Sequence, residues 1–384
     1  MDKVKTIEPR DWMITPATQK VMATLGEGST LFVGGCVRNV LLGTPVTDVD
    51  IATKHHPEQT ITLLEKNGIK AIPTGVEHGT ITAIIDDQSF EITTLRKDVE
   101  TDGRRAVIAF ADTWEEDSQR RDFTINTLLM NEKGEVSDPT EQGIEDLERQ
   151  TIRFVGDPEE RILEDILRIL RFFRFHATYG KGAPEDDALK ACAKYADKIP
   201  ELSKERITQE FLKIIELDNP ENVLRIMRDN GILLELITDD LEAFGKFCKA
   251  QSEYDLKSTE ARLFVLNEPE VLESFLILPN KTKKAMKAID QVLNLPALIN
   301  DHAIKVSMYK HGRDATAQAL MIEYASVKLS HTPKAIDIIQ SWDIPNFPIT
   351  GDDLIKEGIP KGPELGRELK RREEEWIKDG FRAT

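Results

Sequence analysis

Acidic side chains at two places in the amino-terminal part of the chain have the spacing of a metal site. Asp48 and Asp50 stand two residues apart in the β-rich run VTDVDIA at 46–52. Alternate residues of a strand point to the same face, so the two carboxylates would lie close together, which is costly unless cations join them. Glu91, in the run FEITTL at 90–95, adds a third carboxylate on a neighbouring predicted strand. We therefore predict a Mg²⁺ site for phosphoryl or nucleotidyl transfer, with solvated strand-end acids as the alternative.

A glycine pair precedes these acids, in the segment GGCVRNVLLG at 34–43. The pattern predicts a strand that runs into Gly34 and Gly35, followed by a helix whose first turn carries Arg38. Glycines at a strand-to-helix turn let backbone N–H groups approach a phosphate, and the amino end of the helix adds partial positive charge. A guanidinium one turn into the helix can bind the same anion. The turn is therefore predicted to bind a phosphate group.

The segment RRDFTINTL at 120–128 is a second polar cluster. We expect Arg120, Arg121 and Asp122 at the start of an apolar helix, with Asn126 one turn further on. Arginine there would suit a triphosphate, whereas the Asp and Asn side chains could hydrogen-bond ribose hydroxyls. The alternative is an Asp122 helix cap beside solvated arginines.

A long helix is predicted from Pro158 onward, with Asp157 as its N-cap. At about 100° per residue, one polar face gathers Arg161, Glu164, Asp165, Arg168 and Arg171, with Arg174 on its flank. On this face Asp165 can accept a hydrogen bond from the exocyclic amine of cytosine or adenine, and Arg168 can donate to the adjacent ring nitrogen. Uracil and guanine would place a carbonyl oxygen against the carboxylate. A stripe of ion pairs is the alternative reading of this face.

The elements that must position these residues divide the chain into a β-rich part and a helical part. Short apolar runs alternate with Gly and Pro over residues 29–95, with helical patterns at about 36–43 and 57–67. The polar stretch RKDVETDGRRA at 96–106 is expected to be a mobile loop. Strand signals vanish beyond residue 139, and helical periodicity continues nearly to the end. The predicted fold class is α+β, with an N-terminal mixed-sheet head followed by an all-α remainder.

Composition limits the classes of protein that the chain can belong to. The 384 residues include 51 Lys+Arg and 68 Asp+Glu, a net charge of −17, and 40% are hydrophobic. Such a chain is globular, and its acidity excludes general coating of nucleic acid, so any RNA must meet a locally basic groove. The three cysteines lack CxxC spacing, as in a reducing compartment. With no apolar run of ~20 residues and no apolar amino-terminal segment, we expect a cytoplasmic protein without membrane association or an obligate protein partner.

The chain resembles the bacterial-type (class II) tRNA nucleotidyltransferases, the CCA-adding enzymes of the polymerase-β-like superfamily. The resemblance rests on four motifs in the family's order: GGCVRNVLLGTPVTDVDI at 34–51, EITTLR at 91–96, RRDFTIN at 120–126 and EDILR at 164–168. The DxD pair marks the whole superfamily, whereas RRDFTIN together with EDxxR is far more specific. Asn39 stands where the family usually has Asp.

The resemblance implies template-independent addition of C, C and A to the 3′ end of tRNA lacking a complete CCA, from CTP and ATP, with release of pyrophosphate. It implies that Asp48 and Asp50 bind Mg²⁺ in a two-metal mechanism, with Glu91 as the third catalytic carboxylate. The nucleotide-binding residues implied by motif match are Gly35, Arg38, Arg121, Asp122, Asn126, Asp165, Arg168, Arg171 and Arg174.

The resemblance also implies a division of the chain into four parts. These are a catalytic nucleotidyltransferase head at 1–148, a neck with the base-reading helix at 149–208, a body at 209–290 and a tail for tRNA binding at 291–384. Cationic candidates for tRNA contact are KTKKAMK at 281–287 and the group Arg367, Lys370, Arg371 and Arg372. Each is otherwise a solvated helix face.

Related activities stay open as alternatives at this point. These are CC-only or A-only addition to tRNA, poly(A) synthesis, and a non-catalytic RNA-binding module. The loop at 96–106 favours full CCA addition, because enzymes that add only CC lack it, and the intact carboxylates argue against a non-catalytic module.

Overall fold

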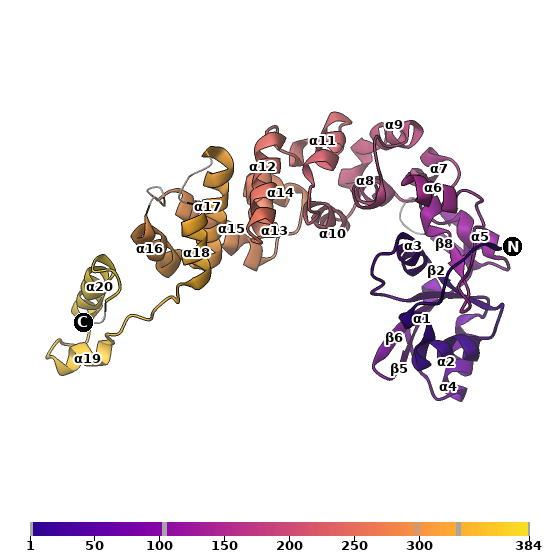
Figure 1. Ribbon diagram of the computed structural model, residues 1–384, viewed down its shortest axis with the longest axis horizontal. Coiled ribbons are helices and arrows are strands. Elements are labelled where there is room, and N and C mark those ends of the chain that lie inside the picture. The colour runs from indigo at the N-terminus through magenta and orange to yellow at the C-terminus, as the bar shows by residue number, and fades with distance from the viewer. Residues whose placement is uncertain (1–2, 102–105, 296–297, 299, 328–331, 383–384) are drawn as a thin grey trace. The chain divides into compact units, whose positions relative to one another are not determined.

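The computed structural model describes residues 3–101, 106–295, 298, 300–327 and 332–382 (Figure 1). The chain clusters into two compact units, Met1–Ile214 with Ile226–Leu234, and Ile215–Arg225 with Glu235–Thr384. The first unit contains every predicted catalytic and nucleotide-binding residue. Among the described residues, no helix combines the length and apolar character that crossing a membrane requires.

An eight-stranded mixed sheet forms the centre of the first unit, in the order β1-β10-β9-β2-β3-β6-β5-β4. The strands are β1 (Lys3–Thr6), β2 (Thr30–Val33), β3 (Asp50–Thr53), β4 (Lys70–Gly75), β5 (Thr80–Ile85), β6 (Gln88–Thr94), β9 (Leu129–Met130) and β10 (Glu135–Ser137). β3 and β6 pair in parallel, whereas the other neighbouring strands in this sheet pair antiparallel. The predicted mixed sheet is confirmed.

The helices up to residue 215 lie around and beyond this sheet. They are α1 (Asp11–Ile14), α2 (Pro16–Leu25), α3 (Gly35–Leu42), α4 (Pro57–Lys66), α5 (Trp114–Gln119), α6 (Gly143–Arg149), α7 (Pro158–Glu164), α8 (Leu167–Tyr179), α9 (Asp186–Lys194) and α10 (Lys204–Ile215), with 3₁₀ turns η1 (Val76–His78), η2 (Thr124–Asn126) and η3 (Ala196–Glu201). The helices α3 and α4 confirm the two helical patterns expected between the strands. Phe32, Ile51 and Ile92 of three adjacent strands are fully buried, so the sheet is anchored by its apolar face.

The stretch predicted as a mobile loop is instead the main part of a β-hairpin. Strands β7 (Arg96–Thr101) and β8 (Ala106–Phe110) pair antiparallel, with Arg96 opposite Phe110. The interpretation was wrong because charge excludes a segment from the core but not from a two-stranded ribbon, whose backbone groups satisfy one another. Residues 102–105 of the predicted loop lie outside the described residues.

The long helix predicted from Pro158 is interrupted. Asp165 has an extended backbone (φ −154°, ψ 104°) between α7 and α8. Its Oδ1 accepts a hydrogen bond from the backbone N–H of Leu167, the first residue of α8, at 3.1 Å. The prediction of a single polar face assumed an uninterrupted helix and is therefore wrong. The helix breaks because a short polar side chain competes with the helix for backbone donors.

The second unit consists of helices, as predicted, and no strand occurs among the described residues beyond Ser137. The described helices beyond residue 220 are α11 (Glu221–Asp229), α12 (Leu241–Glu253), α13 (Thr259–Leu266), α14 (Pro269–Phe275), α15 (Asn280–Leu293), α16 (Asp301–His311), α17 (Arg313–Val327), α18 (Thr332–Ser341), α19 (Gly351–Lys356) and α20 (Pro363–Lys378), with the 3₁₀ turn η4 (Leu234–Leu236). The residues of α11 and of η4 are divided between the two units. One apolar core, which includes Phe247, Met308 and Leu320, joins α12, α16 and α17.

Candidate active site

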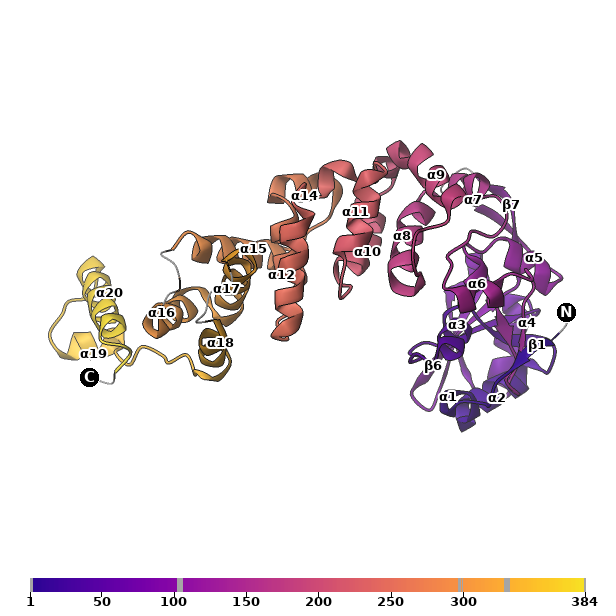
Figure 2. The same ribbon diagram turned by 45° about the horizontal axis from the view of Figure 1, so that its top comes forward.

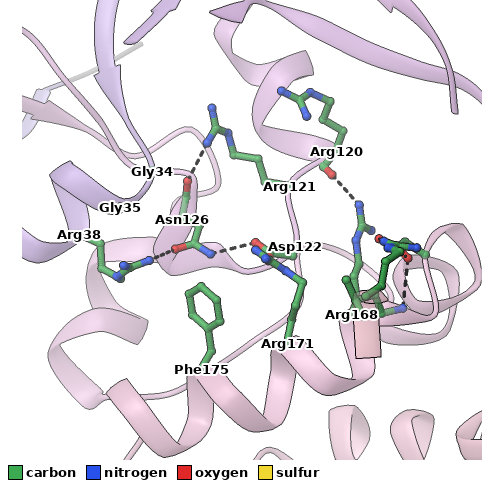
Figure 3. Close-up of a pocket in the computed structure, with 13 residues that line it drawn as sticks. Gly34, Gly35, Arg38, Arg120, Arg121, Asp122, Asn126, Arg168, Arg171 and Phe175 are labelled. Carbon is green, nitrogen blue, oxygen red and sulfur yellow. Dashed lines mark hydrogen bonds and ion pairs between the residues drawn. The ribbon is translucent and has the colours of Figure 1, made fainter. Parts of the chain in front are cut away.

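A pocket of about 470 Å³ opens in the first unit. It is lined by Gly34, Gly35, Arg38, Arg120, Arg121, Asp122, Asn126, Asp165, Leu167, Arg168, Arg171, Phe175 and Arg206. Figure 3 shows side chains from three separate stretches of the chain around this hollow. The structure therefore brings together eight of the nine predicted nucleotide-binding residues. The exception is Arg174, which is not part of the lining.

The glycine turn forms one wall of the pocket. Gly34 has a positive φ of 67°, which lets the chain turn sharply from β2 into α3. A β-carbon at this position would stand 3.5 Å from Nη1 of Arg121 and 4.0 Å from Oδ2 of Asp50. A side chain there would therefore fill the space between the glycine turn and Asp50.

Arg38 is buried beside this wall and forms hydrogen bonds with three side chains. Its Nη1 donates to Oδ1 of Asn126 at 2.5 Å, and its Nη2 donates to the Tyr179 hydroxyl at 2.8 Å and to Oδ1 of Asn39 at 3.0 Å. The guanidinium also lies 4.2 Å from the centre of the Tyr179 ring. Burial lowers the pKa of Arg38, although Tyr179 and Asp122 oppose that effect. The group is held in one orientation before any ligand binds.

The RRDFTIN segment does not begin the apolar helix that its pattern predicted. Arg120 is the C-cap of α5, Asp122 follows in an irregular turn, and only a 3₁₀ turn covers Thr124–Asn126. The segment instead pairs with a neighbouring stretch, because the backbone N–H of Val155 donates to the Asp122 carbonyl at 3.1 Å. Phe123 packs against the Phe154 ring with their centres 5.0 Å apart. Tertiary pairing thus outweighs the local helical pattern.

Asp122 connects this segment to α8. Its Oδ2 accepts from Nε of Arg171 at 2.8 Å, and its Oδ1 accepts from Nδ2 of Asn126 at 2.9 Å (Figure 3). Burial alone would raise the pKa of Asp122, but Arg171 and the hydrogen bond from Asn126 outweigh it and lower the pKa. Asp122 is therefore ionised at neutral pH and orients both neighbours.

The predicted base-reading pair lies on the opposite wall. Both oxygens of Asp165 accept from Nη2 of Arg206, at 3.0 and 2.8 Å. Arg168 donates to Oε2 of Glu164 at 2.7 Å and to the Arg120 carbonyl at 3.0 Å. A carboxylate has about four lone-pair sites, so the Arg206 contact leaves Asp165 able to accept a further hydrogen bond.

Arg174 faces away from the hollow. Its Nε donates to Oε2 of the buried Glu210 in α10 at 2.6 Å, and its guanidinium lies 4.5 Å from the centre of the Phe175 ring. Figure 2 shows α10 beside α8, which explains how a residue predicted for the pocket pairs with the next helix. Arg174 therefore supports the pocket through Phe175.

None of the three predicted catalytic carboxylates lines the pocket, although Asp50 lies near its glycine turn. Asp50 and Glu91 are paired residues of the parallel strands β3 and β6. Asp48 is exposed in the loop before β3, so the expectation that both aspartates share a strand is corrected. The strand begins only at Asp50, where its ladder with β6 starts, and its ladder with β2 reaches no further toward the loop than Ile51. Burial, together with the charges of Glu91 and Asp48, raises the pKa of Asp50.

These carboxylates fit a divalent cation by their charge. Within the described part of the chain, no three His, Cys, Asp or Glu side chains already converge at metal-binding spacing. The raised pKa of Asp50 nevertheless shows that its ionised form is penalised by burial and by the two other acids. A cation between them would relieve that repulsion, and oxygen ligands of this kind suit hard divalent ions.

Three residues of the site escaped the sequence analysis. Asp117 holds Arg120 and Arg121, Tyr179 holds Arg38, and Arg206 holds Asp165. Asp117 stands three and four residues before Arg120 and Arg121, a helical spacing that the sequence analysis did not use, whereas Tyr179 and Arg206 lie far from their partners, with Arg206 41 residues from Asp165. A lone charged or aromatic residue at such a distance could not be assigned from the pattern.

The cationic candidates in the second unit differ in how far they are neutralised. Arg371 pairs with Glu368 and Glu375, and Arg372 pairs with Glu357 and Glu368. In α15, Lys283 pairs with Glu273, whereas Lys284 and Lys287 are exposed and form no ion pair within the described residues. α15 therefore offers more uncompensated positive charge than α20.

Comparison with known proteins agrees with a nucleotidyltransferase site. Residues 30–153 match the family model of the poly A polymerase head domain, and residues 183–241 match the model described as a probable RNA and SrmB-binding site of polymerase A. The fold resembles the crystal structure of Bacillus stearothermophilus CCA-adding enzyme in complex with CTP, with a TM-score of 0.75, 27% identity, and 96% of this chain and 94% of that chain covered.

Two relatives identify the family to which the chain belongs. It is 33% identical to the mitochondrial CCA tRNA nucleotidyltransferase 1 of Mus musculus over 91% of this chain and 83% of the relative. It is 34% identical to the CCA-adding enzyme of Streptococcus pneumoniae (strain CGSP14) over 88% of this chain and 86% of the relative. The chain belongs to the family of CCA-adding tRNA nucleotidyltransferases, as the four motifs had indicated.

Proposed function

We propose that this protein adds C, C and A to the 3′ end of tRNA lacking a complete CCA, using CTP and ATP and releasing pyrophosphate. The observation that carries the proposal is the convergence, in one pocket, of the glycine turn, Arg121 and the pair Asp165 and Arg168. A triphosphate-binding wall thus faces side chains able to distinguish cytosine and adenine from uracil and guanine. Family membership supports the same activity.

The chemical step forms one bond and breaks another at the α-phosphorus of the bound nucleotide. The tRNA 3′ oxygen attacks that phosphorus while the bond to the β-phosphate oxygen breaks, and pyrophosphate leaves. Asp48 and Asp50 are the proposed ligands of Mg²⁺, with Glu91 as the third catalytic carboxylate. When bound, Mg²⁺ would neutralise phosphate charge and favour ionisation of the attacking hydroxyl.

The pocket residues bind the phosphates, the ribose and the base of the nucleotide. The backbone at Gly35 and the guanidinium of Arg121 bind the phosphates, while the proposed phosphate contact of Arg38 would draw on a group already fixed by Asn126. Asp122 with Asn126 faces the ribose. Because their mutual hydrogen bond is already made, little freedom is lost when a nucleotide binds.

The base is selected by protein groups in place of a nucleic-acid template. Asp165 accepts from the exocyclic amine of cytosine or adenine, and Arg168 donates to the adjacent ring nitrogen. Arg171 completes the pocket, and Arg174 contributes through the Phe175 ring. A mismatched base would leave buried polar groups unpaired, at a cost of about 1–3 kcal/mol for each lost contact.

We further propose the division into a head at 1–148, a neck at 149–208, a body at 209–290 and a tail at 291–384, with tRNA contacted by cationic side chains beyond the pocket. We also propose cytoplasmic location. The free, buried thiols of Cys36, Cys192 and Cys248 suit a reducing compartment.

A single extension assay tests the activity. The protein and Mg²⁺ are incubated with tRNA ending at the discriminator base, with CTP alone, ATP alone or both, beside an unstructured RNA. Extension by two nucleotides with CTP and by three with both, on tRNA only, is the expected result. Addition that stops at two would identify a CC-adding enzyme. Long A tails on any RNA would identify a poly(A) polymerase, and no extension would leave an RNA-binding module.

A further inference from the structure

One buried carboxylate beside the pocket belongs to none of the recognised motifs. Asp117, near the end of α5, has a side chain only 3% exposed. Its Oδ1 accepts from Nε and Nη2 of Arg120 at 3.0 and 2.7 Å. Its Oδ2 accepts from Nε and Nη2 of Arg121 at 3.3 and 3.0 Å. A single carboxylate thus holds two neighbouring guanidinium groups of the pocket.

The same carboxylate also holds the first residue of the β7–β8 hairpin. The backbone N–H of Arg96 donates to Oδ1 of Asp117 at 3.2 Å. The backbone carbonyl of Arg96 accepts from Nε of Arg120 at 3.1 Å. Both backbone polar groups of Arg96 are therefore bound by the Asp117–Arg120 pair.

Arg120 and Arg121 also form hydrogen bonds with other residues of the pocket. Nη1 of Arg121 donates to the Asn126 carbonyl at 3.3 Å, and the Arg120 carbonyl accepts from Nη2 of Arg168 at 3.0 Å (Figure 3). Hydrogen bonds thus connect the start of the hairpin at Arg96 to Arg121, proposed to bind phosphate, and to Arg168, proposed to read the base.

The charge balance depends on Asp117. Burial alone would raise the pKa of this carboxyl, but Arg121 and Arg120 outweigh burial and lower it, so the group is ionised. Burial lowers the pKa of Arg120 to about 10, against the attraction of Asp117. Without the carboxylate, two adjacent guanidinium groups would repel each other and lose their bidentate orientation.

We propose that Asp117 is a positioning residue for nucleotide transfer, which fixes Arg121 toward the nucleotide phosphates and anchors the β7–β8 hairpin through the same carboxylate. This inference rests on the proposed function, since Arg121 must bind phosphate. Phosphates are common to CTP and ATP, so both nucleotides depend on Asp117 to the same degree, unlike the base-selective effect expected of Asp165.

The test compares Asp117→Asn with Glu116→Gln. Glu116 is the matched control because it is the preceding residue of α5 and pairs with Lys97 of the hairpin but with no pocket arginine. For D117N we expect at least a tenfold rise in the CTP and ATP dissociation constants, measured by calorimetry without tRNA, and an unchanged KM for tRNA. For E116Q we expect nucleotide binding within twofold of the parent protein.

A second readout follows the hairpin. Hydrogen exchange of the Arg96 amide is expected to accelerate at least tenfold in D117N and to change little in E116Q. D117N leaves one neutral amide oxygen where the carboxylate offers two charged oxygens to Arg96, Arg120 and Arg121. D117N that binds both nucleotides as the parent does, or that leaves exchange at Arg96 unchanged, would overturn the proposal. So would a loss confined to one nucleotide.

Two controls separate folding and activity from positioning. If D117N unfolds, Asp117→Glu keeps the charge and displaces it by one methylene, and the same thresholds for binding and exchange then decide. If the parent protein binds nucleotides but extends no tRNA, the proposed activity fails while the binding and exchange data still judge the role of Asp117.

Discussion

Arg171 donates from both Nε and Nη2 to one oxygen of Asp122, at 2.8 and 2.5 Å. The pair joins two motifs that lie 49 residues apart in the chain. It joins the RRDFTIN segment to α8, and both residues line the pocket. The same carboxylate orients Asn126, which accepts a hydrogen bond from Arg38. A substitution at Asp122 would therefore also alter the hydrogen bonding of Arg38.

Asp122→Asn is expected to lower the free energy of unfolding by about 2 kcal/mol near neutral pH, because Arg171 loses its charged partner. The folded-state pKa of Asp122 lies below its unfolded value, so this stabilisation is present above about pH 4 and is lost as the pH falls through the folded pKa. Denaturant unfolding of both proteins across that range measures the effect. Their stability difference should shrink toward acid pH, and a difference that grew would contradict the assignment.

Asp50→Asn is expected to abolish nucleotide transfer yet raise the melting temperature without metal. The folded-state pKa of Asp50 is raised, so its ionised form costs stability once the pH exceeds the unfolded value, and the amide removes that cost. Added Mg²⁺ should raise the melting temperature of the parent protein and have little effect on the variant. Equal Mg²⁺ shifts in both proteins would argue against Asp50 as a ligand.

Asp165→Ala is expected to reduce discrimination of C and A against U and G by about tenfold, because one hydrogen-bond acceptor for the base is lost. Mg²⁺ affinity should hardly change. Single-nucleotide extension with all four triphosphates measures the selectivity. Arg206→Ala serves as the comparison, since it frees the Asp165 carboxylate but leaves it in place, and it should retain more selectivity. A fully selective Asp165→Ala protein would disprove the base-reading role.

Asn39 stands where the family usually has Asp, and its hydrogen bonds lead to a specific prediction. Its Oδ1 accepts from Arg38 at 3.0 Å, and its Nδ2 donates to the Pro45 carbonyl at 3.1 Å. Asn39→Asp keeps the acceptor for Arg38, so we expect CTP affinity within about threefold of the parent. Asn39→Leu removes it and should weaken CTP binding by about tenfold, the worth of a hydrogen bond to a charged group. Calorimetry that ranked the two variants in the reverse order would refute this role.

The lysines of α15 are expected to contribute more to tRNA binding than the arginines of α20. Lys284→Gln with Lys287→Gln should weaken binding and lower the salt dependence of the association constant by about one counterion for each lysine in contact. Arg371→Gln should have little effect, because Arg371 already pairs with two glutamates. Filter binding over a salt series measures both. An unchanged slope for the lysine variant would exclude α15 as a contact.

Local sequence determined the parts of this protein whose chemistry lies in adjacent residues. The glycine turn, the helix that carries Arg38, the mixed sheet and the helical second unit were all predictable, because strand and helix periodicity and the positive φ of Gly34 are local properties. The motifs also identified eight of the residues that line the pocket.

Tertiary structure decided how those residues are held. The hairpin at Arg96 and the irregular turn at Asp122 depend on partners elsewhere in the chain, which hydrogen-bond or pack more favourably than a continued local pattern. The break at Asp165 combines a local hydrogen bond from Leu167 with an ion pair to Arg206. The spacing of Asp117 from Arg120 and Arg121 is local, whereas Tyr179 and Arg206 carried no recognisable signal. Each of these two has its role only because folding brings it within hydrogen-bond distance of Arg38 or Asp165.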